Sequence, residues 1–474
     1  MRHALVSALT LAAAAPLSAQ LPKLDQPIID RYVSVAQPLV AITHVTLVDG
    51  TGGPTRTDQT VVLRDGTIAD VGPASKVQVP AGATEIDGRG KTVIPGMIGL
   101  HDHLFYMASG GRANQMNFTA PRLYLASGVT TIRTTGSASP YADINLKRDV
   151  DAGKSPGPHI VVTTPYLTGP DGGGQMATAT TPEQARKFVA YWAEEGASWI
   201  KFYASISRAA MKAAIDEAHK RGMRATGHLC SVTFREAVEM GIDDFAHGAL
   251  TMSDFAANKE PDKCPDNIMG ILDTAITDKG PVATPLIELM VKKKVSMTTT
   301  MPVYEAFYPK RPVTDERTTE LMTGELKEAY LAERAFIDTT SAWPFTEQGF
   351  QRALAFDRAF DAAGGILASG VDPTGNGGAL PGFGDQRGYE LQREAGLTTQ
   401  QAVQVVTLNG AKVLGDAAKI GSVEKGKRAD LVLLDGDLTQ DVAVIRKPGT
   451  VFKDGVGYDS AKLIAATKGR VGIN

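Results

Sequence analysis

Cysteine is scarce in this chain, and neither sign of charge dominates it. The 474 residues include only two cysteines, Cys230 and Cys264, too few for a disulfide framework, and whether they form one bridge or stay as two thiols is left open. With 49 basic and 52 acidic residues, the formal net charge is −3 and the pI is near 6.3. This balance lacks the basic footprint that phosphate backbones or anionic membranes select, so we expect no nucleic-acid partner.

Long apolar runs are also absent, except at the start of the chain. Met1-Arg-His-Ala precedes the apolar stretch Leu5–Leu17, and small residues at Ser18 and Ala19 precede Gln20, a pattern typical of a secretory signal and its cleavage site. We therefore interpret residues 1–19 as a signal peptide rather than an ordinary buried helix, and expect a periplasmic or secreted protein. No other segment reaches the roughly 20 continuous apolar residues that a membrane span requires, so we expect no membrane span.

The two ends of the chain share a β-strand texture. Apolar and polar residues alternate in short runs such as Ala41–Val48, and the same texture returns near the end in Ala429–Gly436. Both runs are followed or closed by Asp-Gly turn signals. We predict a small β-sandwich domain formed from both chain ends, with residues 36–90 as its N-terminal part and residues 416–460 as its C-terminal part.

Between these ends, short apolar strands alternate with longer helical stretches, which indicates repeated βα units and a parallel sheet. One helix has a recognisable start, where Thr181 can cap the helix and Gln184 occupies its third position. Eight strands close a barrel, so we predict an α/β fold with a (β/α)8 TIM barrel over residues 91–415. The expected strands are Val93–His101, Val129–Thr134, His159–Pro165, Trp199–Ala204, Arg224–Leu229, Asp244–Gly248, Val295–Met301 and Ile366–Asp372.

Residues that bind metals gather at the C-terminal ends of these strands, where barrel active sites are built. His101 and His103 are two residues apart on one strand, so both imidazoles point to the same side. His228 and His247 end two further strands, and Asp372 ends the eighth, where a carboxylate among apolar residues needs a partner or a metal. The remaining histidines, for which we expect no metal role, are His3, His44, His159 and His219.

Lys201 is unusual because the pattern of Trp199-Ile-Lys201-Phe-Tyr203 buries it on the fourth strand. A lysine there is costly unless it is neutralised or modified. Carbamylation by carbon dioxide would convert it into a carboxylate that can bridge two cations; the alternative is a lysine paired with a neighbouring carboxylate. Tyr203 should face the same side, where it either hydrogen-bonds the substrate or packs against its neighbours.

The strand-end motifs together resemble those of the amidohydrolase superfamily, in its imidazolonepropionase-like and prolidase-like branch. The likeness extends over about residues 40–457 and includes a closing segment, Gly421-Ser-Val-Glu-Lys-Gly-Lys-Arg-Ala-Asp430-Leu. The motifs that carry it are Val93-Ile-Pro-Gly-Met-Ile-Gly-Leu-His101-Asp-His103, Lys201 on the fourth strand, Ala225-Thr-Gly-His228, Asp244-Phe-Ala-His247-Gly and Gly370-Val-Asp372.

The resemblance implies a hydrolase with two divalent metal ions. Imidazole and carboxylate ligands without cysteine suit zinc, with manganese or cobalt as substitutes. Such cations lower the pKa of a bridging water and polarise the scissile carbonyl group. By this resemblance His101, His103 and Asp372 hold the more buried ion, His228 and His247 hold the second, and carbamylated Lys201 with a hydroxide bridges both.

The same resemblance assigns the catalytic roles. Asp372 would take the proton of the water and pass it to the leaving group. The other residues expected to act in catalysis are Lys201, Tyr203 and His228. The substrate implied is a small molecule or short peptide, cleaved at an amide bond as in a small peptide or an N-acyl amino acid. A lactone, a cyclic amide or another ester is the alternative within hydrolases, and a non-catalytic exported binding protein is the alternative outside them. Formation of a homo-oligomer is left open.

Several features bear on the choice of substrate. Superfamily deaminases place a Glu shortly after the histidine of the fifth strand, where this chain has Leu229-Cys-Ser-Val, which argues against a deaminase. The prolidase-like relatives carry Thr-Gly-Gly-His-Gly after the third strand and Val-Arg-Asp after the second; here these segments are Leu167–Gly174, without histidine, and Ile132-Arg-Thr134. The aromatic-rich stretch Pro302–Gln348 is interpreted as a lid or substrate wall, or else as an outer helical decoration.

Overall fold

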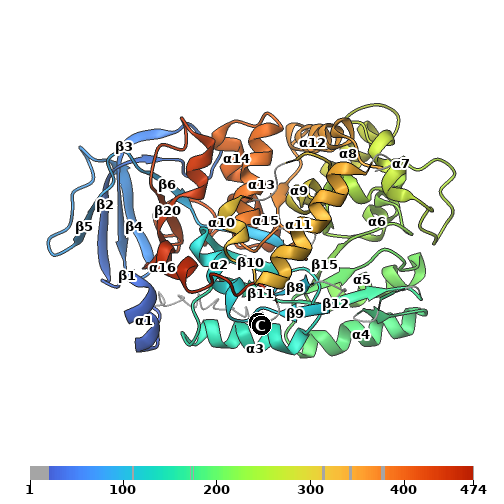
Figure 1. Cartoon of the computed structure of the whole chain (residues 1–474), viewed down its shortest axis with the longest axis horizontal. Helices are drawn as coiled ribbons and strands as arrows, with labels where there is room; N and C mark the ends of the chain where they lie inside the picture. The colour runs from blue at the N-terminus through green and yellow to red at the C-terminus, as the bar shows by residue number, and fades with distance from the viewer. Residues whose placement is uncertain are drawn as a thin grey trace, which may run out of the picture.

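Parallel strands that alternate with helices form the centre of the molecule (Figure 1). The computed structural model describes residues 21–108, 112–170, 172–173, 176–311, 315–340, 344–374 and 379–472, so the predicted signal peptide lies outside the described residues. The central strands are β7 (Met97–Asp102), β10 (Val129–Thr134), β11 (His159–Val161), β12 (Thr163–Thr168), β13 (Ala177–Thr178), β14 (Trp199–Phe202), β15 (Arg224–Gly227), β16 (Asp244–Ala246), β17 (Ser296–Thr299) and β18 (Leu367–Ser369).

These strands pair in parallel as two sheets, one in the order β11-β10-β7 and the other in the order β13-β12-β14-β15-β16-β17-β18. The sheets meet at two places. The backbone N–H of Asp372, just after β18, donates to the carbonyl of His101 in β7 at 2.7 Å. On the other side, the N–H of Thr163 in β12 donates to Oγ1 of Thr134 in β10 at 3.0 Å. The carboxyl ends of all these strands therefore face the same way.

Helices connect the strands, and Figure 1 shows α3, α4 and α5 along the lower edge and α8, α12 and α14 along the upper edge. The helices are α1 (Gln26–Tyr32), α2 (Thr119–Ala126), α3 (Pro140–Asp151), α4 (Pro182–Glu194), α5 (Arg208–Lys220), α6 (Phe234–Met240), α7 (Ile268–Ala275), α8 (Ala283–Lys293), α9 (Met301–Glu305), α10 (Glu316–Thr319), α11 (Gly324–Thr339), α12 (Glu347–Ala362), α13 (Phe383–Glu394), α14 (Thr399–Val406), α15 (Leu408–Leu414) and α16 (Ser460–Ala465), with short 3-10 turns at η2 (Gly248–Thr251), η3 (Ser253–Phe255) and η4 (Val442–Arg446).

Local sequence accounts for the helices that position the site. The capping box predicted at Thr181 and Gln184 is present at the start of α4. Helix α5 buries an apolar stripe at the helical spacing read from the sequence, so it packs against β14 and β15. Among the described residues, no helix is both long and apolar enough to cross a bilayer.

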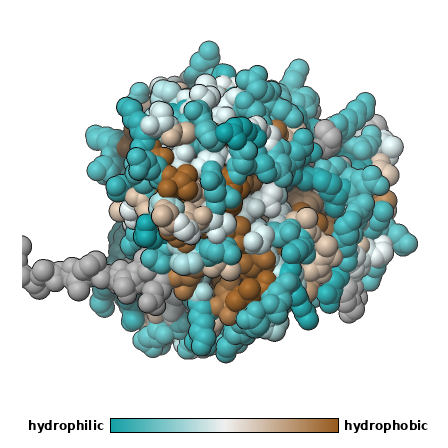
Figure 2. Space-filling model, turned by 90° about the vertical axis from the view of Figure 1, so that its left-hand side faces the viewer, coloured by the Kyte–Doolittle hydropathy of each residue, from teal (hydrophilic) through white to brown (hydrophobic). Residues whose placement is uncertain are grey.

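Both ends of the chain enter a nine-stranded mixed sheet at one end of the molecule, where the blue strands lie beside the red β20 in Figure 1. Figure 2 shows this end of the molecule, where hydrophilic side chains surround separate apolar patches. The sheet runs β1-β21-β20-β19-β6-β2-β3-β4, with β5 on β2, and comprises β1 (Val33–Val35), β2 (Leu39–Leu47), β3 (Arg56–Arg64), β4 (Thr67–Pro73), β5 (Thr84–Asp87), β6 (Thr92–Pro95), β19 (Leu431–Leu434), β20 (Pro448–Lys453) and β21 (Val456–Asp459).

Two strands predicted as continuous are each divided in the structure. The prediction Val93–His101 was wrong in its first part, because β6 pairs with β19 of the nine-stranded sheet and only β7 pairs with β10. The chain changes sheets at Gly96, whose N–H donates to the carbonyl of Asp430, and a Cβ at Gly96 would clash with Thr130. The prediction His159–Pro165 also divides, since β11 pairs with β10 and β12 with β14, on either side of Val162.

Candidate metal centre

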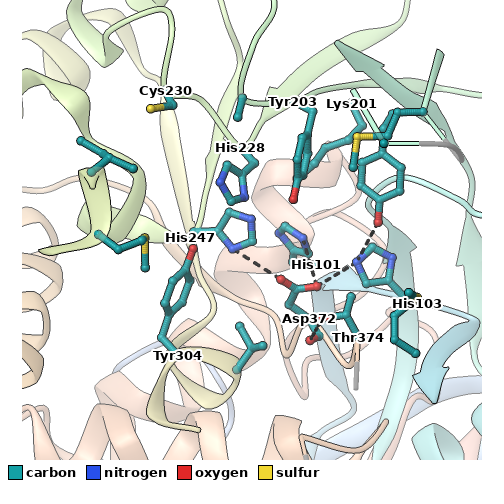
Figure 3. A pocket seen from close by; sticks show the side chains of 18 of the residues that line it. His101, His103, Lys201, Tyr203, His228, Cys230, His247, Tyr304, Asp372 and Thr374 are labelled. Carbon is teal, nitrogen blue, oxygen red and sulfur yellow. Dashed lines mark hydrogen bonds and ion pairs between the residues drawn. The ribbon is translucent and has the colours of Figure 1, made fainter. Parts of the chain in front are cut away.

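The side chains of all six predicted metal ligands line one cavity of about 810 Å³ at the carboxyl ends of the central strands (Figure 3). His101 ends β7, His228 and His247 directly follow β15 and β16, and Lys201 lies in β14. These residues come from parts of the chain as far apart as β7 and the turn after β18. The parallel pairing of the strands is what brings them together, as the sequence predicted.

Asp372 is the central acceptor of the site. Its Oδ1 atom lies 2.9 Å from Nε2 of His103 and 3.8 Å from Nε2 of His101, and its Oδ2 atom lies 3.7 Å from Nδ1 of His247. Ligand atoms of His101, His247 and Asp372 all lie within 4.8 Å of one another, which is close enough to hold one metal ion. Because the Asp372 side chain keeps 14% of its exposure, it can contact a substrate in the cavity.

The orientation of His103 suits a metal ligand. Its Nδ1 lies 3.1 Å from the carbonyl oxygen of Gly136, and its Nε2 lies 2.9 Å from Oδ1 of Asp372. The contact with Gly136 fixes the ring so that Nε2 points toward the carboxylate. A hydrogen bond to the other ring nitrogen is the usual support of a metal-binding histidine.

The backbone of two candidate ligands has a positive φ, which residues other than glycine rarely adopt. His247 has a φ of 73° and Asp372 has a φ of 53°. Strain of this kind costs on the order of 1–3 kcal/mol and concentrates at functional sites. His247 comes directly after β16 and Asp372 three residues after β18, and the two side chains face each other in the cavity in Figure 3.

The remaining histidine, His228, lies beside His247, with ring centroids 4.5 Å apart, and beside the ring of Tyr203, at 4.7 Å. Thr300 holds the other side of His247, since its Oγ1 lies 2.8 Å from Nδ1. Loss of hydration lowers the pKa of His228 to about 3. The pKa values of His101 and His247 are also lowered well below the usual value, first by loss of hydration and then by a neighbouring group, Lys201 for His101 and His228 for His247. These imidazoles are therefore neutral at physiological pH, as metal ligands must be.

Lys201 is completely buried on β14. Desolvation lowers the pKa of its amine to about 7, against the opposing attraction of Asp372. A buried lysine with such a pKa is largely neutral near pH 8, which is the form that reacts with carbon dioxide. Among the described residues, its Nζ has no hydrogen-bond partner, and neither does the buried Nδ1 of His101.

These two partnerless nitrogens provide a test of whether the residues fit a metal centre. Buried polar atoms normally have a partner in the protein or in ordered water, so each exception needs an explanation. His101 and Lys201 both line the same cavity as Asp372. The residues therefore fit divalent cations with an added oxygen group on Lys201, because both would supply the partners that the chain itself does not.

A buried charge pair supports the base of the site. Arg133 donates to Oδ2 of Asp244 at 2.7 Å and to the carbonyl of Leu100 at 2.8 Å, and both charged side chains are fully buried. Asp244 also accepts hydrogen bonds from the hydroxyls of Thr226 and Thr298 at 3.0 Å. The pair joins β10, β15, β16 and β17 below the ligands, so Arg133, the residue of the relatives' Val-Arg-Asp pattern that this chain keeps, has a structural partner.

Two further tyrosines line the cavity, of which the sequence reasoning missed Tyr166 and placed Tyr304 in the expected lid or substrate wall. The hydroxyl of Tyr166 on β12 lies 3.5 Å from Nε2 of His103. Tyr304 on α9 places its ring 5.5 Å from that of His247. Tyr166 comes only one residue after the end of the predicted third strand, so its position at a strand end was a usable signal. Tyr304 belongs to the aromatic-rich stretch, and Val303, Tyr304 and Phe307 line the cavity as the substrate-wall interpretation expects.

Tyr203 lines the cavity on the side of Lys201, with its hydroxyl pointing inward in Figure 3. Its ring packs edge to face on Tyr166, with centroids 5.4 Å apart. Desolvation raises the pKa of Tyr203 to about 12, so its hydroxyl keeps its proton and is a hydrogen-bond donor at all physiological pH values. Both sequence interpretations, packing and substrate contact, are thus compatible with its position.

The two cysteines, whose pairing the sequence left open, form a disulfide between Cys230 and Cys264, and both also line the cavity. The other histidines lie away from the lining. His3 is outside the described residues, and His44, His159 and His219 lie 2.6, 3.1 and 2.9 Å from Asp58, Asp454 and Asp243. Gly173, in the segment Leu167–Gly174, also lines the cavity.

Comparison with known protein families gives a match to the model of the "Amidohydrolase family" over residues 92–300 and 334–456. The first segment contains the candidate ligands from His101 to His247, and the second contains Asp372. Among curated proteins, the imidazolonepropionase of Stenotrophomonas maltophilia (strain R551-3) is 35% identical over 104 residues. That match spans 20% of this chain and only 25% of the length of the relative.

Solved structures match over more of the chain. A provisionally assigned prolidase of Bifidobacterium longum is 26% identical, with a TM-score of 0.62, and the match covers 88% of this chain and 94% of the other. A Xaa-Pro dipeptidase with methionine bound in its active site is 18% identical, with a TM-score of 0.64 and coverage of 89% and 100%. At 18% identity, the match to the Xaa-Pro dipeptidase shows only that the two proteins share a fold.

Proposed function

The chain belongs to the amidohydrolase family, and on that premise we propose that it is an exported hydrolase that cleaves a carbon–nitrogen bond with two divalent cations in the cavity described above. The proposed bond is the amide of a small peptide or of an N-acyl amino acid. The observation that carries the proposal is the buried Lys201, whose Nζ has no partner among the described residues although it lines the same cavity as four histidines and an aspartate. Modification to a metal ligand would give this nitrogen the partner that it lacks.

His101, His103 and Asp372 would hold one cation, and His228 and His247 the other, with carbamylated Lys201 shared between them. Zinc suits this set of nitrogen and oxygen ligands best. When bound, such cations lower the pKa of a shared water molecule and polarise the carbonyl group of the substrate.

The side chains of the protein supply the remaining chemistry. Asp372 lies between His103 and His247 and is partly exposed to the cavity, so its carboxylate can accept the proton of the attacking water and return it to the leaving nitrogen. Tyr203 keeps its proton because of its raised pKa, and its hydroxyl can donate to the oxygen of the substrate carbonyl. Tyr166 contacts the ring of His103 and Tyr304 that of His247, so both tyrosines pack against candidate ligands.

We further propose that the two parallel sheets form one (β/α)8 barrel over residues 91–415. The contacts between β18 and β7 and between β12 and β10 support this closure. The nine-stranded sheet would then be the β-sandwich domain proposed for residues 36–90 and 416–460, to which β1 and β6 add strands just outside the first of these ranges. The signal-like residues 1–19 and the disulfide in the described part of the chain support export, since disulfides persist in oxidising compartments.

A substrate panel tests the proposed function. Zinc-loaded protein would be incubated with dipeptides, N-acyl amino acids, lactones and cyclic amides, and products would be quantified by mass spectrometry. We expect turnover of at least one linear amide, and loss of that turnover in Asp372→Asn. Turnover restricted to lactones would replace the amide with an ester as the substrate class, and no turnover of any member, with zinc bound, would favour a non-catalytic binding protein.

A further inference from the structure

The disulfide joins the metal centre to a separate wall of the cavity. Cys230 follows His228 by two residues, and Cys264 precedes Ile268, the first residue of α7, by four. Ile268 and Met269 both line the cavity, as do the two cysteines. The bridge therefore fixes the start of α7 to the loop that carries a predicted metal ligand. We call Cys230, Cys264, Ile268 and Met269 the disulfide wall.

Weaker contacts hold the same segment in place. The Nζ of Lys259 donates to the carbonyl of Ser231 at 2.7 Å. Arg208, at the start of α5, donates through Nε to Asp262 at 3.1 Å, but both side chains are about 39% exposed, so this pair adds little. Helix α7 is also held by buried Asp273, whose carboxylate accepts hydrogen bonds from the N–H and the hydroxyl of Thr346 at 3.0 and 2.8 Å. The covalent bridge adds a direct tether between the segment that leads into α7 and the loop after β15.

The disulfide wall lies on one side of the metal centre. In Figure 3, Cys230 lies on the side of His228 and Tyr304, away from His103. Tyr304 and Phe307, whose rings lie 6.2 Å apart, also line the cavity. The opposite side has its own apolar residues, with Phe105 in ring contact with His103 at 4.8 Å and Met107 nearby on the same strand, β8 (Phe105–Ala108).

The cavity offers little to recognise a charge on the substrate. Among the described residues that line it, the charged side chains other than histidine are Lys201 and Asp372, and the metal centre uses both. A free carboxylate or ammonium group placed against Ile268 or Met269 would lose its hydration without gaining a partner, which is strongly unfavourable. An alkyl or aromatic group placed there would gain free energy from burial.

We propose that the disulfide wall is the specificity surface of the enzyme, and that it binds an uncharged, apolar group of the substrate on the His228 side of the scissile bond. This inference rests on the proposed function and adds the substrate class, an amide that carries an alkyl or aromatic group next to the bond. Cys230 and Cys264 act as positioning residues, because they hold Ile268 and Met269 against that group.

The test uses hydroxamic acids, which bind divalent cations and need no turnover. Hexanohydroxamic acid and adipic acid monohydroxamate have the same number of carbon atoms and differ in a terminal methyl or carboxylate group. Calorimetric titration of the zinc-loaded protein should show that the hexanoyl compound binds about tenfold more tightly. Met269→Asp should abolish this preference, whereas the matched control Met107→Asp, on the opposite side of the centre, should keep it.

The double variant Cys230→Ala/Cys264→Ala tests the bridge itself. It should weaken binding of hexanohydroxamic acid about fivefold or more and leave acetohydroxamic acid, which has no tail to reach the wall, within about twofold. A general loss of folding would weaken both probes alike and would overturn the positioning role. Three results would contradict the proposed role of the disulfide wall. The wild type could bind the two matched probes equally well, it could bind neither probe, or Met107→Asp rather than Met269→Asp could abolish the preference. Because these affinities do not depend on catalysis, absence of amide turnover with the preference intact would reject only the proposed function.

Discussion

His103 and Asp372 are separated by 269 residues in the chain, yet Nε2 of the first lies 2.9 Å from Oδ1 of the second. The contact exists because β7 and β18 are neighbours, and because the carbonyl of Gly136 orients the imidazole ring. A histidine nitrogen and a carboxylate oxygen at this distance are close enough to bind one metal ion together. The contact thus links the topology of the sheet to the chemistry of the site.

Asp372→Asn should remove the proton acceptor and keep the shape of the side chain. We expect kcat to fall by about 10²–10⁴, the usual contribution of a general acid–base group, together with a loss of zinc. Steady-state kinetics and elemental analysis on the same sample measure both quantities. Normal kcat in Asp372→Asn would show that another group moves the proton.

Lys201→Ala should lose most activity and most metal affinity, because the buried amine is proposed to carry the bridging carbamate. Short carboxylic acids such as acetate or propionate should restore part of both by filling the space left by the side chain. Lys201→Arg should not be rescued, because arginine keeps its charge and offers no oxygen ligand. Near-normal turnover of Lys201→Ala with its full metal content would identify Lys201 as structural.

The pKa of Lys201 predicts how activation depends on pH. Desolvation lowers this pKa from 10.5 to about 7, and only the deprotonated amine attacks carbon dioxide. The reactive fraction therefore grows as pH rises through about 7 and is nearly complete above it. The rate at which metal-free protein regains activity with zinc, at a fixed concentration of dissolved carbon dioxide, should level off by about pH 8. A rate that continues to rise toward pH 10 would indicate an ordinary exposed lysine.

The sequence predicted the ligands because each follows directly from local pattern. A histidine or aspartate at the end of an apolar strand, as at His247 or Asp372, is visible without any knowledge of the fold. The division at Gly96 was not visible, because the residues on both sides of it are apolar and strand-like, and only the approach of Thr130 requires the glycine. Tyr166 was missed because the third strand was predicted to end at Pro165, one residue before it, whereas β12 continues to Thr168.

The disulfide illustrates a further limit of the sequence. Cys230 and Cys264 are separated by 34 residues, and their approach depends on how the segment before α7 returns to β15. Nothing in the composition of that segment fixes such a path. The contacts of Lys259 and Asp254 with the region around α6 depend on the folded arrangement in the same way.

The N-terminal prediction concerns the mature protein. If residues 1–19 are a signal peptide, protein recovered from the periplasm or medium of an expressing cell should begin near Gln20. Intact-mass measurement identifies that terminus directly, and an Ala19→Arg variant should slow processing and serve as the control. Recovery of exported protein that retains Met1 would contradict the signal peptide.

The number of metal ions per chain tests the central claim most directly. Protein purified with zinc, passed through a desalting column and analysed by inductively coupled plasma mass spectrometry should contain two ions per chain, because His101, His103, Lys201, His228, His247 and Asp372 provide ligands for two. Lys201→Ala, which lacks the bridging group, should contain clearly fewer. A wild-type protein that consistently retains one ion or none, with the cavity otherwise folded, would contradict the two-metal centre.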